Sequence, residues 1–270
     1  MTVAVITDTA ASISRRLADE WNVRLVPLSV MVAGRTYRDT EVDLASLPAA
    51  RITTSGPPPG EFLAALADAR DGAVIVTVAA SLSSAHASAR AATTAMDVPV
   101  EIVDSRTAAG AQALVVLAAA ERANRGAGVA EVAEAARAAA GDVQLVGCLA
   151  DLEGLAHSGR VPGLAATAAR KAGLRFMFRL TDGAVRPMKP ASSRSAAVDR
   201  MVSMCTTSAR AGSVADIITL GDDADLRSRL THARDSGRLA VGRLYAGTFG
   251  TAITVYTSPH VTGLAWRWRS

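Results

Sequence analysis

Aromatic residues, lysine and cysteine are scarce in this sequence of 270 residues. Only 4% of the residues are aromatic while 50% are hydrophobic, so Ala, Val and Leu must build most of the core. Cys148 and Cys205 give neither a disulfide framework nor a metal-binding spacing, and we expect both thiols to be reduced. The arginines are scattered among acids, apart from a locally basic segment over residues 160–194 that could meet an acidic partner or a phosphate. Without a long basic stripe interleaved with aromatics, we expect no nucleic-acid binding.

Long apolar runs are also missing. The longest weakly polar run, Thr107–Ala120, contains Gln112 and is shorter than the roughly 20 residues that a membrane-spanning helix needs. The first residues reach Asp8 before any signal-like stretch is built. We therefore expect a cytoplasmic protein with no stable membrane insertion.

Motifs for several common chemistries are absent. The sequence contains neither a G-x-G-x-x-G turn after its first strand nor a G-x-x-x-x-G-K-[ST] loop, so it gives no support for nucleotide binding. It also lacks the hydrolase elbow G-x-S-x-G. Four widely spaced histidines show no metal-ligand spacing, and we expect no metal site and no cofactor.

Short apolar strands alternate with Ala-rich helices through the first half of the chain, which predicts an α/β domain with a Rossmann-like parallel sheet over residues 1–150. The apolar runs flanking Asp182-Gly183 predict a hairpin, so we expect a second, α+β domain over residues 151–270, with its last strand near Ala252–Tyr256. In open parallel sheets, ligands bind beyond the carboxyl ends of the strands. Asp8 lies at such an end, where it could cap a helix, orient amides or act as an acid.

Two clusters of hydroxyl residues lie at turns that lead into helices. Thr53-Thr54-Ser55 runs into Gly56 and three prolines, which predicts a stiff loop rather than a strand. Ser81 to Ser84 follows a predicted buried strand. An ordinary surface turn and a plain helix cap would use the same residue types, but two such turns could also converge on one oxygen-rich ligand group.

In their order and spacing, motifs along nearly the whole chain resemble the DegV family of two-domain bacterial fatty-acid-binding proteins. The motifs are Ile6-Thr7-Asp8-Thr9-Ala10, Val26-Pro27-Leu28, Tyr37-Arg38-Asp39, Thr54-Ser55-Gly56-Pro57, Gly60-Glu61-Phe62, Leu82-Ser83, Ser88-Ala89, Val103-Asp104-Ser105 and Gly159-Arg160.

The resemblance implies a long acyl chain buried between the domains, with its carboxylate held at Thr54 and Ser83. Their neighbours Ser55 and Ser84 join this predicted site. Where the family has a histidine near its C-terminus, this chain has Tyr256, with His260 four residues later, and we include both. The family's Leu-Ser-Gly-Thr-Tyr turn here reads Leu-Ser-Ser-Ala-His.

Some family members present the bound fatty acid to a separate kinase, and the resemblance places Arg160 near that partner or its phosphate. We therefore expect a fatty-acid-binding protein that is not itself an enzyme, with a fatty acid kinase subunit as a candidate partner. An esterase or acyl transferase that pairs Ser83 with His86 or His260 is the alternative. A nucleic-acid-linked regulator is a third, suggested only by the isoelectric point of 9.6.

Overall fold

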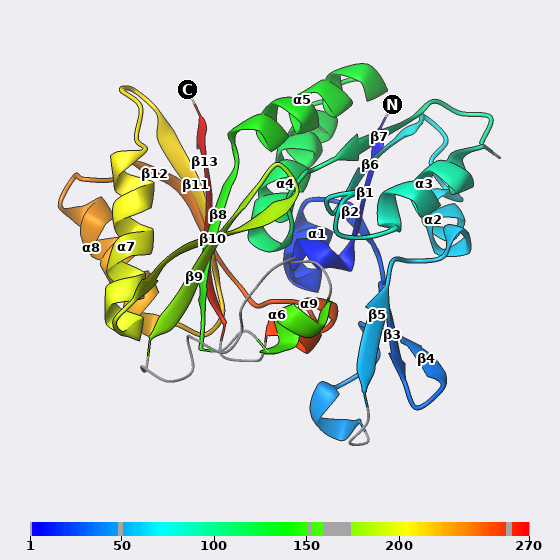
Figure 1. The fold of residues 1–270 in the computed structure, drawn as a ribbon. Coiled ribbons are helices and arrows are strands. Elements are labelled where there is room, and N and C mark those ends of the chain that lie inside the picture. The colour runs from blue at the N-terminus through cyan, green and yellow to red at the C-terminus, as the bar shows by residue number, and fades with distance from the viewer. Residues whose placement is uncertain are drawn as a thin grey trace.

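The computed structural model describes residues 2–47, 51–94, 96–150, 153–158, 174–257 and 261–269. Their strands form a four-stranded, a six-stranded and a three-stranded sheet (Figure 1). The α/β fold, with a parallel sheet first and a mixed sheet second, confirms the predicted fold class.

The four-stranded sheet is parallel throughout and has the order β2-β1-β6-β7. Its central strands are short, fully buried apolar runs, as expected for a sheet with helices on both faces. Val5 and Val74 point to one face, and Ile6 and Ile75 point to the other. Its strands are β1 (Ala4–Asp8), β2 (Val23–Val26), β6 (Ala73–Thr77) and β7 (Val100–Asp104).

Five helices accompany this sheet. They are α1 (Arg15–Glu20), α2 (Pro59–Leu66), α3 (Ala85–Thr93), α4 (Ala109–Asn124) and α5 (Val129–Asp142). Helices α2 and α3 pack on the face of Ile6, whereas α4 and α5 pack on the face of Val5. The Ser14 hydroxyl caps α1 by accepting a hydrogen bond from the Leu17 N–H.

The six-stranded sheet has the order β10-β9-β8-β13-β11-β12, and only its β11–β12 pair is parallel. One face packs on α7 (Arg194–Thr207) and α8 (Ala224–Asp235), and the other packs on α4. The hairpin at Asp182-Gly183 is confirmed, and both residues have the positive φ that a tight two-residue turn requires. Its strands are β8 (Gln144–Leu149), β9 (Arg175–Thr181), β10 (Ala184–Ala191), β11 (Val214–Leu220), β12 (Val241–Gly247) and β13 (Thr262–Arg269).

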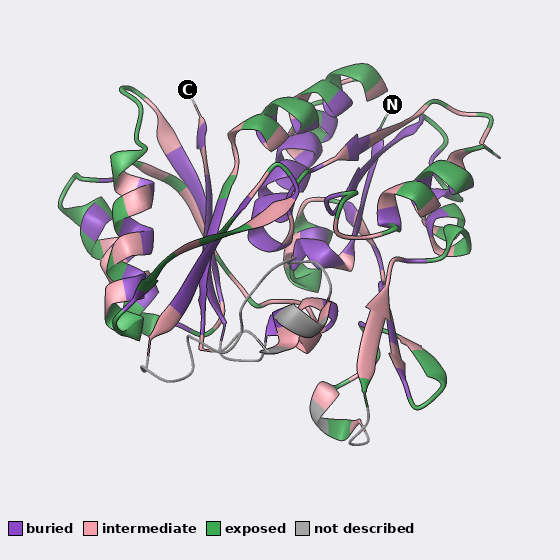
Figure 2. Cartoon of the chain, in the orientation of Figure 1, coloured by how far each residue is buried: buried purple, intermediate pink, exposed green. Residues whose placement is uncertain are grey.

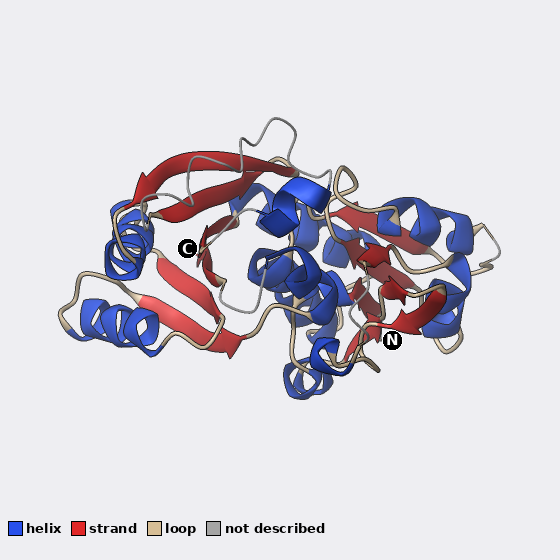
Figure 3. Cartoon of the chain, turned by 60° about the horizontal axis from the view of Figure 1, so that its bottom comes forward, coloured by secondary structure: helices blue, strands red, loops and turns tan. Residues whose placement is uncertain are grey.

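Helix α4 lies between the two large sheets, and 13 of its 16 residues are buried (Figure 2). Figure 3 shows the same arrangement from another side, with helices between the strands of the two sheets. A Cβ atom on Gly110 would come within 3.0 Å of the Ile218 side chain and 3.2 Å of Ala265, so glycine lets α4 approach the six-stranded sheet closely. The two sheets therefore share the core around α4.

A small antiparallel sheet of order β4-β3-β5 projects from the rest of the molecule (Figure 1). It consists of β3 (Ser29–Val32), β4 (Arg35–Arg38) and β5 (Ile52–Ser55). Two 3-10 helices, η1 (Thr9–Ala11) and η2 (Leu44–Ser46), and two short helices, α6 (Glu153–Ser158) and α9 (Thr251–Thr257), complete the described elements. Within the described ranges, no helix combines the length and the apolar character that crossing a membrane would require.

The structure corrects two of the predicted elements and adds one. Residues 53–55 belong to strand β5 and not to a loop, because they pair with β3 before the prolines begin. The predicted final strand near Ala252–Tyr256 is instead helix α9, and the final strand is β13. Strand β8 was not predicted, and it already belongs to the six-stranded sheet. The domain division between residues 150 and 151 stays a prediction, and the change from one sheet to the next precedes β8.

Candidate functional site

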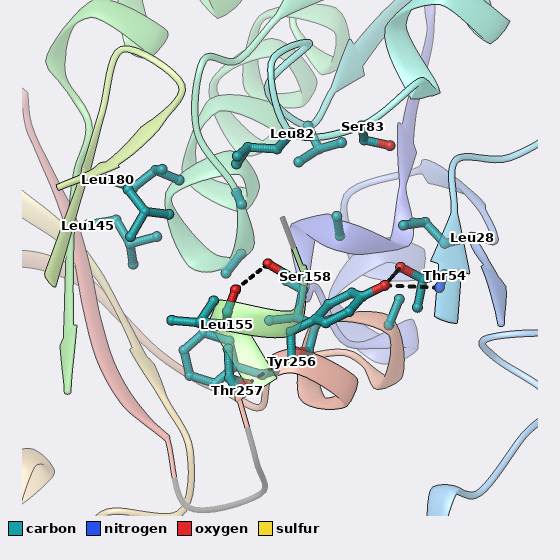
Figure 4. Close-up of a pocket in the computed structure, with 18 of the residues that line it drawn as sticks. Leu28, Thr54, Leu82, Ser83, Leu145, Leu155, Ser158, Leu180, Tyr256 and Thr257 are labelled. Atoms are coloured by element: carbon teal, nitrogen blue, oxygen red, sulfur yellow. Dashed lines mark hydrogen bonds between the residues drawn. The ribbon is translucent and has the colours of Figure 1, made fainter. Parts of the chain in front are cut away.

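A cavity of about 140 Å³ lies between the four-stranded and six-stranded sheets (Figure 4). This volume is roughly ten times what one water molecule requires. Most of its lining is apolar. The lining residues come from the six-stranded sheet, from β5, from turns beyond the ends of the four-stranded sheet, and from α4, α6 and α9. The lining residues are Ala10, Leu28, Thr54, Ser55, Val78, Leu82, Ser83, Ala108, Ala109, Leu145, Leu155, Ser158, Phe178, Leu180, Val185, Phe249, Ala252, Ile253, Tyr256 and Thr257.

Thr54 and Tyr256 form a hydrogen-bonded pair at one side of this cavity (Figure 4). The backbone N–H of Thr54 donates to the phenol oxygen of Tyr256 at 3.0 Å, and the two hydroxyl oxygens are also 3.0 Å apart. Because the N–H can only donate, the Tyr256 hydroxyl proton can point to Thr54 Oγ1. The Thr54 hydroxyl can then donate its own proton to a further acceptor in the cavity.

Ser83 lines the same cavity from the turn before α3. Its Oγ accepts a hydrogen bond from the Ala85 N–H at 3.2 Å, which leaves the Ser83 hydroxyl proton to donate elsewhere. Gly56, just after β5, lies directly against this turn: a Cβ atom there would lie 2.6 Å from Ser84 Oγ and 2.7 Å from the Ala85 nitrogen. Glycine at position 56 thus brings the two predicted hydroxyl clusters together.

An outer pocket of about 490 Å³ adjoins this hydroxyl side. It shares Thr54, Ser55, Leu82 and Ser83 with the cavity, so a group held by these hydroxyls could be reached from outside. The remaining lining residues of the outer pocket are Gly56, Ala80, Ser81, Ser84, His86 and Ala87.

The predicted site residues thus occupy different places. Thr54, Ser55, Ser83 and Tyr256 line the cavity, whereas Ser84 lines only the outer pocket. The predictions at Arg160 and His260 fall outside the described residues.

The hydrogen bonds around Ser83 do not form a nucleophile–base pair. His86 Nδ1 lies 3.2 Å from Thr77 Oγ1, and Ser83 Oγ accepts from Ala85. Across the ranges that the structure describes, Ser83 and His86 share no hydrogen bond, although activation of a serine nucleophile would require one. The geometry therefore gives no support to the Ser83–His86 alternative, and the Ser83–His260 alternative falls outside the described residues.

Two buried carboxyl groups hold the loops around the cavity. Asp8 accepts hydrogen bonds from the Val78 N–H at 2.8 Å, the Ala10 N–H at 3.1 Å and Gln112 Nε2 at 3.2 Å. Burial outweighs these donors and raises the Asp8 pKa from 3.8 to about 6. Asp8 therefore orients amides and caps η1, which was one of its predicted roles.

Asp39 connects the first half of the chain to α9. It accepts from the Thr9 hydroxyl at 2.8 and 2.9 Å and from the backbone of Ala252 in α9. Burial raises the Asp39 pKa to about 6. The Ser12 hydroxyl accepts from the Gly250 N–H at 3.1 Å, so η1 and Asp39 both fix the start of the helix that carries Tyr256.

Several cavity residues carry no signal in the sequence. Leu145, Phe178 and Phe249 are ordinary apolar residues in or beside strands of the six-stranded sheet, and only the tertiary fold brings them to one cavity. Within the described part of the chain, no group of three or more His, Cys, Asp or Glu side chains could hold a metal ion.

Comparison with known proteins gives one consistent result. The model of the DegV family, described as uncharacterised proteins, matches residues 2–268. A DegV domain-containing protein of Mycobacterium tuberculosis is 32% identical over 189 residues, which cover 68% of each chain.

Solved structures agree with this match in fold. The chain superposes on a Thermus thermophilus DegV family protein, described by its fatty acid binding, with a TM-score of 0.86 at 24% identity, covering 99% of both chains. The Streptococcus pneumoniae Fatty Acid Kinase (Fak) B3 protein, loaded with linoleic acid, gives a TM-score of 0.84 at 20% identity and the same coverage. At this level of identity the likeness establishes the fold.

Proposed function

Because this chain belongs to the DegV family, we propose that it binds a long-chain fatty acid, with the acyl chain in the apolar cavity and the carboxylate at Thr54 and Ser83. The observation that carries this proposal is the asymmetry of the cavity. Hydroxyl groups of Thr54, Ser83 and Tyr256 lie at one side, and Leu145 and Leu180 lie at the other (Figure 4). An amphipathic ligand with one polar end matches this arrangement.

The energetics are compatible with this ligand. Hexadecanoic acid has about 14 methylene groups, and burying them at roughly 0.8 kcal/mol each gives about 11 kcal/mol. A buried carboxylate costs several kcal/mol unless donors meet it. The Thr54 and Ser83 hydroxyls supply such donors, with Tyr256 orienting the first and the Ala85 N–H orienting the second.

We further propose that the protein is not an enzyme and presents the acid to a separate kinase, in the cytoplasm. The outer pocket beside Thr54 and Ser83 supports this role, because it lets a partner reach the carboxylate. The S. pneumoniae neighbour, which belongs by name to a fatty acid kinase system, also favours it.

Native mass spectrometry of the purified protein tests the binding proposal. We expect a mass increment of one fatty acid, or its appearance after incubation with hexadecanoic acid. Thr54→Val, Ser83→Ala and Tyr256→Phe should each lower the affinity by the equivalent of about 1–3 kcal/mol, because each removes a partly buried hydrogen-bonding group that a bound carboxylate would cover. Thr207→Val, which changes an exposed hydroxyl at the end of α7, is the matched control. A wild-type protein that takes up no fatty acid would contradict the proposal.

The kinase proposal needs a separate measurement. Arg160→Ala should keep the occupancy of hexadecanoic acid within a few-fold of wild type and abolish acyl-phosphate formation when a fatty acid kinase and ATP are added. Equal losses of occupancy and phosphorylation would show that Arg160 supports the ligand or the fold, and not the partner.

A further inference from the structure

Two glycines face each other in the middle of the six-stranded sheet. Gly147 of β8 and Gly263 of β13 are direct register partners, and β8 and β13 are the two central strands. Glycine weakens the interior of a strand, so a pair of facing glycines in two central strands calls for a structural explanation. Neither has a positive φ, so the backbone conformation is not that reason.

Both glycines leave space that a phenyl ring fills. A Cβ atom on Gly147 would lie 2.7 Å from Cζ of Phe178, and one on Gly263 would lie 2.9 Å from Cζ of Phe249. Real Cβ atoms do not come this close, so each ring occupies the position of the missing side chain. Phe178 is also the register partner of Gly147, and its ring therefore lies back over the neighbouring strand.

The same two rings form part of the cavity wall. Phe178 and Phe249 both line the cavity, as does Leu145, which points to the same face of β8 as Gly147. Because the rings sink into the sheet at the two glycines, the cavity is deeper here than it would be over ordinary side chains. Because both rings line the cavity, a ring displaced from the sheet by an added methyl group would reduce the space in the cavity.

We propose that the Gly147–Gly263 pair sets the depth of the apolar part of the cavity, and that Phe178 and Phe249 thereby fix the longest acyl chain that the protein accepts. This inference rests on the proposed function, and it identifies the residues that select among fatty acids. The inference concerns the wall of the cavity at the six-stranded sheet and leaves the roles proposed for Thr54 and Ser83 unchanged.

The test measures the dissociation constants of dodecanoic, tetradecanoic, hexadecanoic and octadecanoic acids for delipidated wild type and variants. Gly147→Ala and Gly263→Ala should move the preference toward shorter acids, with about fourfold weaker binding for each methylene that no longer fits. Phe178→Leu and Phe249→Leu should move it toward longer acids. Combining Gly147→Ala with Phe178→Leu should restore a dependence of the dissociation constant on chain length near that of wild type.

Controls separate this inference from the fold and from the proposed function. Gly141→Ala adds a Cβ atom where nothing lies within 4 Å, and it should leave the length profile unchanged. If the alanine variants fail to fold, the two leucine variants decide alone, since they introduce no new contact. The inference would be overturned if Phe178→Leu or Phe249→Leu did not shift the preferred fatty acid toward a longer chain. Failure of wild type to bind any of the four acids would instead refute the proposed function.

Discussion

The carboxyl groups of Asp8 and Asp39 make folding sensitive to pH. Burial raises both pKa values from 3.8 to about 6 in the folded protein. A carboxyl group whose pKa is raised by folding binds its proton more tightly in the folded state. The resulting stabilisation is fully present below the unfolded pKa of 3.8 and is lost as the pH rises through about 6.

Replacing Asp39 should therefore flatten the pH dependence of stability. A pKa raised from 3.8 to about 6 corresponds to roughly 3 kcal/mol across this window. Urea unfolding should be measured at a series of pH values between 3.8 and about 6. As the pH rises, the free energy of unfolding should fall less in Asp39→Asn than in wild type. Asp222→Asn, in which the replaced side chain is 95% exposed, serves as the control. An equally steep fall in Asp39→Asn would refute the role of Asp39.

At the residue scale, the sequence predicted the hydroxyls but not their surroundings. Thr54 and Ser83 stand out because hydroxyl clusters beside helix starts are visible in a linear sequence. The bond between Thr54 and Tyr256 joins residues 202 positions apart, and residue types alone give no sign of it. The family resemblance singled out position 256, but only the structure shows that Tyr256 contacts Thr54.

At the scale of elements, hairpin β9–β10 carries an unfavourable pair of charges. Arg179 and Arg186 are direct register partners on antiparallel strands, and both are exposed. Like charges directly opposite each other destabilise a sheet. Neither forms an ion pair with any other residue that the structure describes.

Reversing one of these charges should stabilise the hairpin. Arg186→Glu is expected to raise the free energy of unfolding by about 0.2–1 kcal/mol, and the gain should shrink at high salt. Arg179→Glu should act in the same way, and the double variant should lose the gain because it restores repulsion. Urea unfolding of all four proteins measures the coupling. Additive effects of the two changes would show that the arginines do not interact.

The mispredicted elements share a physical cause. Residues 53–55 have the β propensity of threonine, but the prolines that follow favoured a loop, and pairing with β3 decided the outcome. Residues 252–256 include Ile, Thr, Val and Tyr, which favour a strand, yet they form α9 because contacts with Asp39, Ser12 and Thr54 hold them there. Tertiary contacts overrode local propensity in both segments. The strand–helix alternation of the first half was predictable because its periodicity is strong.

At the scale of the whole molecule, helix α4 ties the two large sheets together. Its side chains belong to the cores of both, and at its start Gly110 contacts Ile218 and Ala265 of the six-stranded sheet. An ion cluster adds a second link: Glu121 of α4 pairs with Arg243 at 3.0 Å, and Arg267 pairs with the buried Asp216 at 3.2 Å.

A larger residue at position 110 should destabilise the protein by separating α4 from the sheet. Gly110→Val is expected to lower the free energy of unfolding by about 1–3 kcal/mol, because methyl groups would be forced against Ile218 and Ala265. Gly141→Val, in α5 with open space around it, is the matched control and should not lose stability. Urea unfolding measures both, and equal effects at the two positions would contradict the close approach seen at Gly110.

The shared helix also predicts that the two sheets unfold together. Hydrogen exchange should give the same opening free energy for amides of β1 and β6 as for amides of β11 and β13. In Gly110→Val the six-stranded sheet should become less protected along with the four-stranded one. A sheet that opens alone at a clearly lower free energy in wild type would show that α4 does not couple them.

The position of β13 has a consequence for the order of events during synthesis. The four strands of the parallel sheet lie within the first 104 residues, so that sheet can form early. In the six-stranded sheet, β13 is the last of the described strands along the chain but lies between β8 and β11. Until residues 262–269 emerge from the ribosome, β8 to β10 and β11 to β12 are two separate pieces. Leu145 of β8 and Phe249, which follows β12, line the same cavity, so the wall of the proposed fatty-acid site is complete only after β13 has joined the two pieces.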